Sequence, residues 1–268
     1  MKPNVLIQAL WRRRISLLWW SLGLILMVTL VAIAYPTIRD NSELDKTFGT
    51  LPPSVQALLG LDPANSLTSP AGYLNSQFYA NLLPIILLVF SIGIASWAIA
   101  GDEAGGTLEL LLANPISRLR LALERAVLVV VMIGLLTLVA LVTLGLLAPR
   151  VGLTKGLSIE HIVAATIATT LLALVFAALA FAVGAATGNR SLAVSLSSAI
   201  AVAGFIIEGL GAQVKTLGPL RDISPWHWLL DSQPLHNGLT WQAWLLPLAV
   251  SVVLMAIGIA IFVRRDLR

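Results

Sequence analysis

Long apolar runs without charge, separated by short charged segments, constrain the fold of this chain more than any other feature. The first run, from Ile15 to Ile38, has 24 residues and no charged side chain. As a helix it would be about 36 Å long, whereas the hydrocarbon core of a bilayer is about 30 Å thick. Because a backbone in lipid must satisfy its own hydrogen bonds, the run predicts a transmembrane α-helix.

The composition extends this prediction to the whole chain. Hydrophobic residues make up 58% and charged residues 11% of the 268 residues, whereas soluble domains are about 25% charged. The runs also lack the alternation of a membrane β-barrel. We therefore expect an all-α integral membrane protein in which residues 1–268 form a single transmembrane domain of six helices. The predicted spans are 15–36, 78–100, 126–148, 162–187, 192–211 and 242–263.

The residues argue against several classes of function. There is no cysteine, so thiolate metal sites are excluded, and His161, His227 and His236 are too scattered to predict a metal site. No Gly-Lys pair occurs, so a Walker loop of the usual form is absent and any ATP hydrolysis belongs to another polypeptide. The basic residues flank apolar runs as membrane anchors do, which does not predict nucleic-acid binding.

The distribution of positive charge predicts the orientation. With six spans, the side that holds both termini carries 11 Lys and Arg residues, and the other side carries 6. Cytoplasmic loops are enriched in these residues. We therefore expect both termini and the segment 101–125 to be cytoplasmic.

The N-terminal residues predict a helix lying on the membrane surface. Apolar side chains recur at helical spacing from Val5 to Leu10, and Arg12, Arg13 and Arg14 follow directly. An amphipathic helix with its arginines at the lipid headgroups fits this pattern. A frayed basic leader is the alternative.

Three polar or helix-breaking residues inside the predicted spans are candidates for a pathway or for packing. Asn81 and Pro84 predict a kink in the second span, because proline removes one backbone hydrogen bond. Glu208 is the only acid within a predicted span, and its place near the far interface favours a snorkelling or hydrogen-bonded acid. Small residues that allow close helix contact lie on one face of the fifth span: Ser191, Ser195, Ser198, Ala201 and Gly204.

The segment between the second and third spans predicts a short cytoplasmic helix. Thr107 can cap it, Leu108, Leu111 and Leu112 share one face, and Glu109 points away from them. Pro115 ends it, and Ser117 or the preceding asparagine can cap the next helix. A helix of two turns is marginal without packing. The residues alone leave open whether it docks a partner or is an intracellular loop.

This segment also carries a family resemblance. Asp102-Glu103 followed by Gly106-Thr-Leu-Glu-Leu-Leu-Leu-Ala-Asn-Pro-Ile-Ser-Arg118 resembles the hallmark of permease subunits of type-2 ABC transporters, most of all the multidrug or polyketide-antibiotic exporters. The tail Phe262-Val-Arg-Arg-Asp-Leu267 is similar to their usual ending. The pairs Ser224-Pro225, Pro234-Leu235 and Asn237-Gly238 resemble the segment before their last helix. The family often has Glu-Glu where this chain has Asp102-Glu103.

The resemblance implies a function and a set of partners. In that family the segment is a coupling element that rests on a separate ATP-binding subunit, which holds the ATP and Mg²⁺, and an N-terminal elbow helix lies beside it. Two permeases and two ATPases form the exporter in a prokaryotic cytoplasmic membrane, with a lipophilic or amphipathic substrate. The implied docking residues are Glu103, Gly106, Thr107, Glu109, Leu110, Leu111, Pro115, Ser117 and Arg118, and the elbow residues are Trp11, Arg12, Arg13 and Arg14.

Three other functions remain as alternatives. A membrane anchor or assembly factor can have the same architecture without transport. An ion-coupled carrier needs buried charges in several helices and often repeated halves, neither of which is evident. An intramembrane enzyme needs clustered acid–base or metal residues, which Glu208 alone does not supply. We therefore expect a permease that is not itself an enzyme and binds no cofactor.

Overall fold

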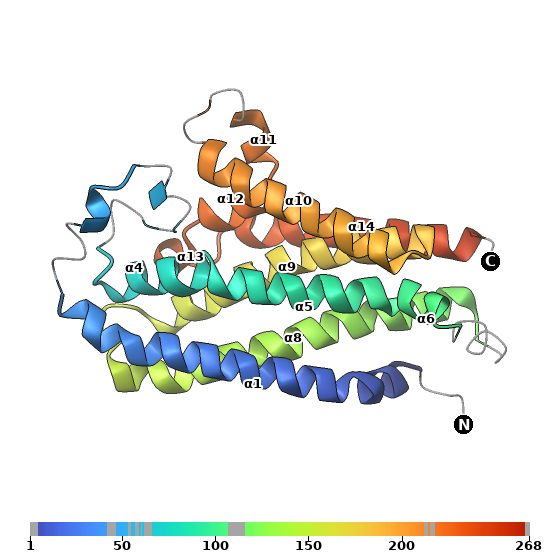
Figure 1. Cartoon of the computed structure of the whole chain (residues 1–268), viewed down its shortest axis with the longest axis horizontal. Coiled ribbons are helices and arrows are strands. Elements are labelled where there is room, and N and C mark those ends of the chain that lie inside the picture. Colours follow the sequence, from blue (N-terminus) through green and yellow to red (C-terminus); the bar gives the residue numbers. More distant parts are fainter. Residues whose placement is uncertain are drawn as a thin grey trace.

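Helices account for the regular structure of the part of the chain that the computed structural model describes, residues 5–41, 47–52, 55–56, 59, 61, 66–106, 116–211, 214 and 218–265. Six helical runs are long and apolar enough to cross a membrane, as the sequence predicts. They lie along one another, with both termini at the same end (Figure 1). The elements are α1 Val5–Arg39, α4 Pro70–Leu74, the π-helix η1 Asn75–Tyr79, α5 Leu82–Ala98, α6 Ala100–Ala104, α8 Arg118–Val151, α9 Ile159–Thr187, α10 Arg190–Gly211, α11 Gly218–Asp222, α12 Pro225–Leu230, α13 Pro234–Asn237 and α14 Trp241–Arg264.

Helix α9 forms the centre of the bundle. In its most apolar stretch 72% of the residues are buried, compared with 22% in α1 and in α14. It packs against α5, α8, α10 and α14. A helix that is apolar on every side is expected to be buried, and the many alanines of α9 let its neighbours approach closely. The bundle is therefore built around an alanine-rich helix.

Helices α14 and α9 approach each other closely at Gly258. A Cβ atom placed on Gly258 would lie 2.8 Å from the Cα of Ala182, and neither backbone can yield without moving a helix. We expect Gly258→Ala to lower the free energy of unfolding by about 1–3 kcal/mol, as overpacking does. Thermal unfolding in detergent measures the change.

Gly134 of α8 provides the matched control for this prediction. Its Cβ position has no atom within 4 Å, so Gly134→Ala should be neutral or stabilise by about 0.5–1 kcal/mol through helix propensity. Equal effects of the two substitutions would show that the α9–α14 contact does not limit the size of residue 258.

The N-terminal residues form the first turns of α1 instead of a separate elbow helix. Residues 5–14 are helical, as expected, but α1 continues without a break for 35 residues to Arg39. No glycine or proline lies between Val5 and Ser21 to end the helix, and arginine is a good helix former. The first turn of α1 is also attached to α8, because the backbone N–H of Leu6 donates to Glu124 Oε2 at 3.0 Å. The arginines therefore continue the axis of the span.

The second span begins earlier than the sequence predicts and is irregular near its start. Ser69 caps α4 by accepting a hydrogen bond from the N–H of Gly72, and the π-helix η1 follows directly. Helix α5 then restarts after Asn81, whose side-chain amide donates to the carbonyl of Ser76 at 3.2 Å. Pro84 is the third residue of α5 and has no N–H to donate to the preceding turn. The expected interruption therefore takes the form of a π-helical turn and a restart.

Three short helices, α11, α12 and α13, lie at the end of the bundle away from the termini (Figure 1). Helix α12 covers part of the small-residue face of α10. The indole of Trp226 donates to the carbonyl of Ala201 at 2.9 Å and lies against Gly204. Ser191 and Ser195, nearer the other end of α10, stay exposed. Only half of the face predicted for helix contact is therefore filled within the described chain.

Candidate functional site

The end of the bundle where both termini lie also holds α6 (Figure 1). Side chains of opposite charge pair with one another there, and we call it the charged end. The short helix α6 is separated from α5 by Ile99, whose φ of −120° and ψ of −58° are not helical. This break changes the direction of the chain before α6, so that Asp102 and Glu103 lie among other helices. The two acids have different partners.

Asp102 is buried and lies among three arginines, of which Arg125 is buried as well. It pairs with Arg125 of α8, and both residues are about 97–99% buried. Arg12 of α1 lies 3.7 Å from the same carboxylate. The guanidinium of Arg13 stacks 3.8 Å from the centre of the Trp97 ring, and that of Arg125 lies 5.2 Å from it. We call these five residues the charged cluster; it joins α1, α5, α6 and α8.

Buried charges of this kind need their partners. Removing a charge from water costs several kcal/mol, and only close partners of opposite sign offset that cost. Cation–π contacts with Trp97 give the arginines a further favourable environment. The charged cluster therefore holds the ends of four helices in one arrangement.

Glu103 connects α6 to two other parts of the chain. Its carboxylate pairs with Arg265, which follows α14 directly. It also lies against Gly188, where a Cβ would be only 2.7 Å away and where φ is +68°. Glycine alone suits both conditions. The backbone carbonyl of Arg265 in turn accepts a hydrogen bond from Arg118 at 2.7 Å.

The described residues on both sides of the segment 107–115 have a defined structure at the charged end. Before it, Gly106 has a φ of +66° after the last turn of α6. After it, Ser117 caps α8 by accepting a hydrogen bond from the N–H of Arg120 at 3.2 Å, as its capping preference predicts. Arg120 also pairs with Glu124 at 2.8 Å. Both ends of the segment are thus attached to the charged end.

The predicted docking residues divide into two groups. Glu103, Gly106, Ser117 and Arg118 lie at the charged end, and Glu103 and Arg118 share Arg265 as a partner. The other five, Thr107, Glu109, Leu110, Leu111 and Pro115, lie outside the described residues.

The predicted elbow residues also divide, according to the face of α1. Arg12 and Arg13 belong to the charged cluster. Arg14 stacks on the exposed Trp11 ring at 3.9 Å and lies on the opposite face. Two arginines of the run therefore face the charged cluster, while the third points away from it.

Glu208 lies at the opposite end of the bundle and has partners. Arg221 donates to Glu208 Oε1 from Nε at 3.1 Å and from Nη2 at 2.9 Å. His227 Nδ1 is 3.3 Å from Oε1 and 3.2 Å from Oε2. The hydrogen bond to Glu208 raises the pKa of Arg221, which therefore stays charged. These contacts attach α11 and α12 to the end of α10.

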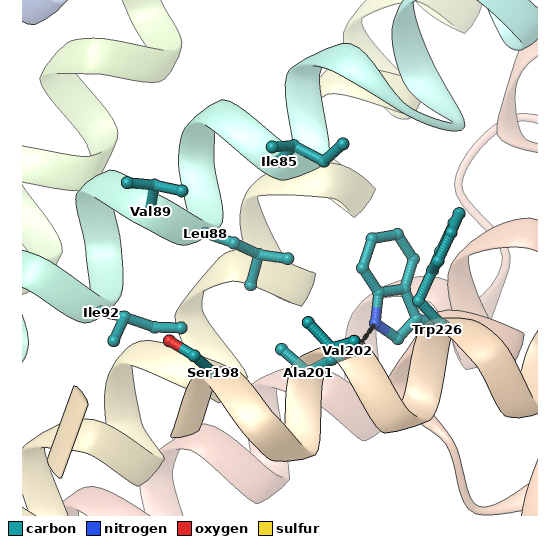
Figure 2. A pocket seen from close by; sticks show the side chains of 9 residues that line it. Ile85, Leu88, Val89, Ile92, Ser198, Ala201, Val202 and Trp226 are labelled. Atoms are coloured by element: carbon teal, nitrogen blue, oxygen red, sulfur yellow. Dashed lines mark hydrogen bonds between the residues drawn. The ribbon is translucent and has the colours of Figure 1, made fainter. Parts of the chain in front are cut away.

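An apolar cavity of about 310 Å³ lies between α5 and α10. Figure 2 shows Leu88 of α5 extending towards Val202 of α10, with the Trp226 ring at one end of the pocket. A size of 300 Å³ is at the lower limit of small-molecule pockets. Its lining residues are Ile85, Leu88, Val89, Ile92, Ser198, Ala201, Val202, Phe205 and Trp226.

Sequence reasoning does not single out the central members of the charged cluster. Trp97 lies inside a predicted span, and Arg125 counts only towards orientation. A signal exists for both: a tryptophan and a lone arginine at the two borders of the charged segment 101–125, where interfacial aromatic and basic residues gather. Within the described chain, no three His, Cys, Asp or Glu side chains form a group that could hold a metal ion.

Six apolar helices with charged and aromatic residues at their ends define a multi-pass helical membrane protein. The family model described as ABC-2 family transporter protein matches residues 7–267. The chain therefore belongs to the ABC-2 family of transporter proteins and is a permease, the membrane component of a transporter. This match confirms the resemblance seen in the sequence. It is also similar to "Uncharacterized protein YhcI" of Bacillus subtilis (strain 168), with 28% identity over 230 residues that cover 76% of this chain and 72% of that protein.

Proposed function

We propose that this permease is the transmembrane subunit of an ATP-driven exporter in a prokaryotic cytoplasmic membrane. Two copies of the chain pair with two copies of a separate ATPase, which binds ATP and Mg²⁺. The charged end faces the cytoplasm, and the segment 101–125 receives the ATPase. The observation that carries the proposal is the anchoring of this segment: Asp102 and Glu103 at its start and Arg118 and Arg125 in its last third are tied into the bundle.

This anchoring gives docking a mechanical consequence. Force on the segment 107–115 reaches α5 through α6 and reaches α8 directly, because the segment is covalently joined to both. Arg265 passes it to α14 through its contacts with Glu103 and Arg118. Since packed helices move as rigid bodies, closure of the ATPases would switch the bundle between two arrangements. This is the coupling that alternating access requires.

The surfaces of α5 and α10 support both the proposed class of substrate and the proposed pairing of two permease copies. The cavity between them is lined by apolar side chains, apart from one serine hydroxyl and the indole N–H, which suits a lipophilic or amphipathic substrate. Helix α10 lies at the edge of the bundle and exposes Leu196, Ile200 and Val202. A second permease on this edge would place the passage between the two copies.

The alternative functions gain no comparable support. An ion-coupled carrier needs a buried charge that is free to bind the ion, but Asp102 and Glu208 both have arginine partners. A membrane anchor or assembly factor would share the docking site and differ only in moving no substrate. We therefore use one experiment on docking and one on transport.

The docking experiment is purification of the full chain together with its native neighbours in mild detergent. We expect an ATP-binding protein to co-purify at one copy per permease, and its ATPase activity to rise with the permease present. The transport experiment places this complex in vesicles and follows ATP-dependent movement of a lipophilic fluorescent dye. Absence of an ATP-binding protein would overturn the proposal. A stable complex that moves no amphipathic probe would favour the anchor function.

A further inference from the structure

A second groove, between α1 and α5, has the features of a binding site for one phospholipid. Its volume is about 350 Å³, and its lining is almost entirely apolar. Helix α1 packs along α8, and the large rings of Trp20 and Phe90, 5.7 Å apart, bridge from α1 to α5. Next to this bridge Gly23 leaves open space, with no atom within 4 Å of its Cβ position. The lining residues are Trp19, Trp20, Gly23, Leu24, Met27 and Ile86.

The two arginines that α1 contributes to the charged cluster, Arg12 and Arg13, lie on the same face of α1 as this groove. Arg12 and Arg13 precede Trp19 and Trp20 by seven residues, which is close to two full turns, or about 10 Å. Both guanidinium groups also reach towards α5 and α6, because one lies over Trp97 and the other near Asp102. The groove therefore leads along α1 to a basic end.

The charge at that end is suited to a phosphate group. Three arginines, Arg12, Arg13 and Arg125, surround the single carboxylate of Asp102, which leaves an excess of positive charge. The two neighbouring acids have arginine partners of their own. The side chain of Arg12 is 54% exposed, so a headgroup can reach it. An anionic headgroup is thereby favoured over a zwitterionic one.

The length of the site matches one leaflet of a bilayer. From Arg12 to Met27 the helix advances 15 residues, or about 22 Å, and one leaflet with its headgroups is about 20–22 Å thick. A phosphate at Arg12 would thus place the end of an acyl chain beside Met27.

We propose that the groove between α1 and α5 binds one anionic phospholipid from the leaflet at the charged end. Its phosphate contacts Arg12, and one acyl chain lies along Gly23. The lipid fills the space between the two helices and covers the outer side of the charged cluster, so the charged end is complete only in a membrane that contains anionic lipid. This inference does not depend on the direction of transport or on the ATPase.

Native mass spectrometry of the full chain in mild detergent tests the headgroup, with added dioleoylphosphatidylglycerol or dioleoylphosphatidylcholine. We expect the anionic lipid to bind at least about fivefold more tightly, and Arg12→Gln to reduce its affinity about fivefold, the factor expected for one basic residue near a lipid surface. Arg14→Gln removes an equal charge from the opposite face of α1 and should change the affinity less than about twofold. Equal effects of the two substitutions, or equal affinity for the two lipids, would overturn the proposal.

A substitution in the groove tests the acyl chain independently. Gly23→Leu fills space that is open beside the helix, so the fold should persist while bound lipid falls to less than about half of the wild-type occupancy. Gly134→Leu, the same change at a glycine of α8 with open space around it, should leave occupancy unchanged. Unchanged lipid occupancy in Gly23→Leu would show that the groove does not hold the lipid. If this variant also loses the dimer, a second copy of the chain fills the groove instead.

Discussion

Asp102→Ala should lower the free energy of unfolding by about 3–5 kcal/mol, the largest effect that we expect from a single substitution in this chain. The substitution removes the carboxylate that pairs with Arg125, which is 97% buried. Arg125 would then be a buried charge next to Arg12 and Arg13, which have the same sign. Thermal or denaturant unfolding of the purified chain in detergent measures the loss.

Two further variants show whether the unpaired charge is the cause. Asp102→Leu combined with Arg125→Met removes both charges and should recover most of the lost stability, as apolar replacement of buried ion pairs does. Asp40→Ala removes the carboxylate of an exposed pair with Arg39 and should change stability by less than about 1 kcal/mol. If the double variant is no more stable than Asp102→Ala, the loss comes from packing around residue 102.

Glu109→Arg should reduce stimulation of the partner ATPase at least about tenfold while the permease still inserts into the membrane. Its place on the predicted helix, facing away from the leucines, makes Glu109 available to a basic group of the partner, and reversal of a charge in an interface costs more than about 1.4 kcal/mol. The measurement is ATPase activity of the reconstituted complex as a function of permease concentration.

Two comparisons make this prediction specific. Glu160→Arg makes the same charge change in the exposed first turn of α9, at the other end of the bundle, and should leave stimulation unchanged. Arg118→Glu should also uncouple the ATPase, but it removes the hydrogen bond to the carbonyl of Arg265 as well. Its unfolding temperature must therefore be measured alongside. If Glu109→Arg and Arg118→Glu both leave stimulation unchanged, the docking assignment is wrong.

The six-helix architecture could be predicted because hydropathy is a local property. The predicted spans 162–187, 192–211 and 242–263 match α9, α10 and α14 to within three residues at each end. Hydropathy is less informative where charge or irregular structure lies inside a helix. Helix α8 starts at Arg118, eight residues before the predicted span, because its first two turns carry charges that are satisfied by neighbours. The second span begins at Pro70 because a π-helical turn joins two helices that differ in polarity.

The charged cluster could be predicted only in part. Local patterns identify the segment 101–118, its acids and the cap at Ser117. Pairing is a property of the folded bundle: Asp102 and Arg125 are 23 residues apart in sequence, and Glu103 and Arg265 are 162 apart. Nothing in a local pattern states which of three consecutive arginines will turn inwards. That choice follows from the rotation of α1 against α8, which long-range packing determines.

The unbroken α1 helix has a geometric consequence for the whole molecule. Its 35 residues form a rod about 52 Å long, well beyond the hydrocarbon core. The rod is fastened near both ends, by Glu124 at Leu6 and by the hydroxyl of Tyr73, which donates to the carbonyl of Val31 at 2.7 Å. A tilt of about 10° around its midpoint would move its two ends by about 4–5 Å in opposite directions. Such a tilt of α1 would convert a displacement on one membrane surface into an opposite one on the other.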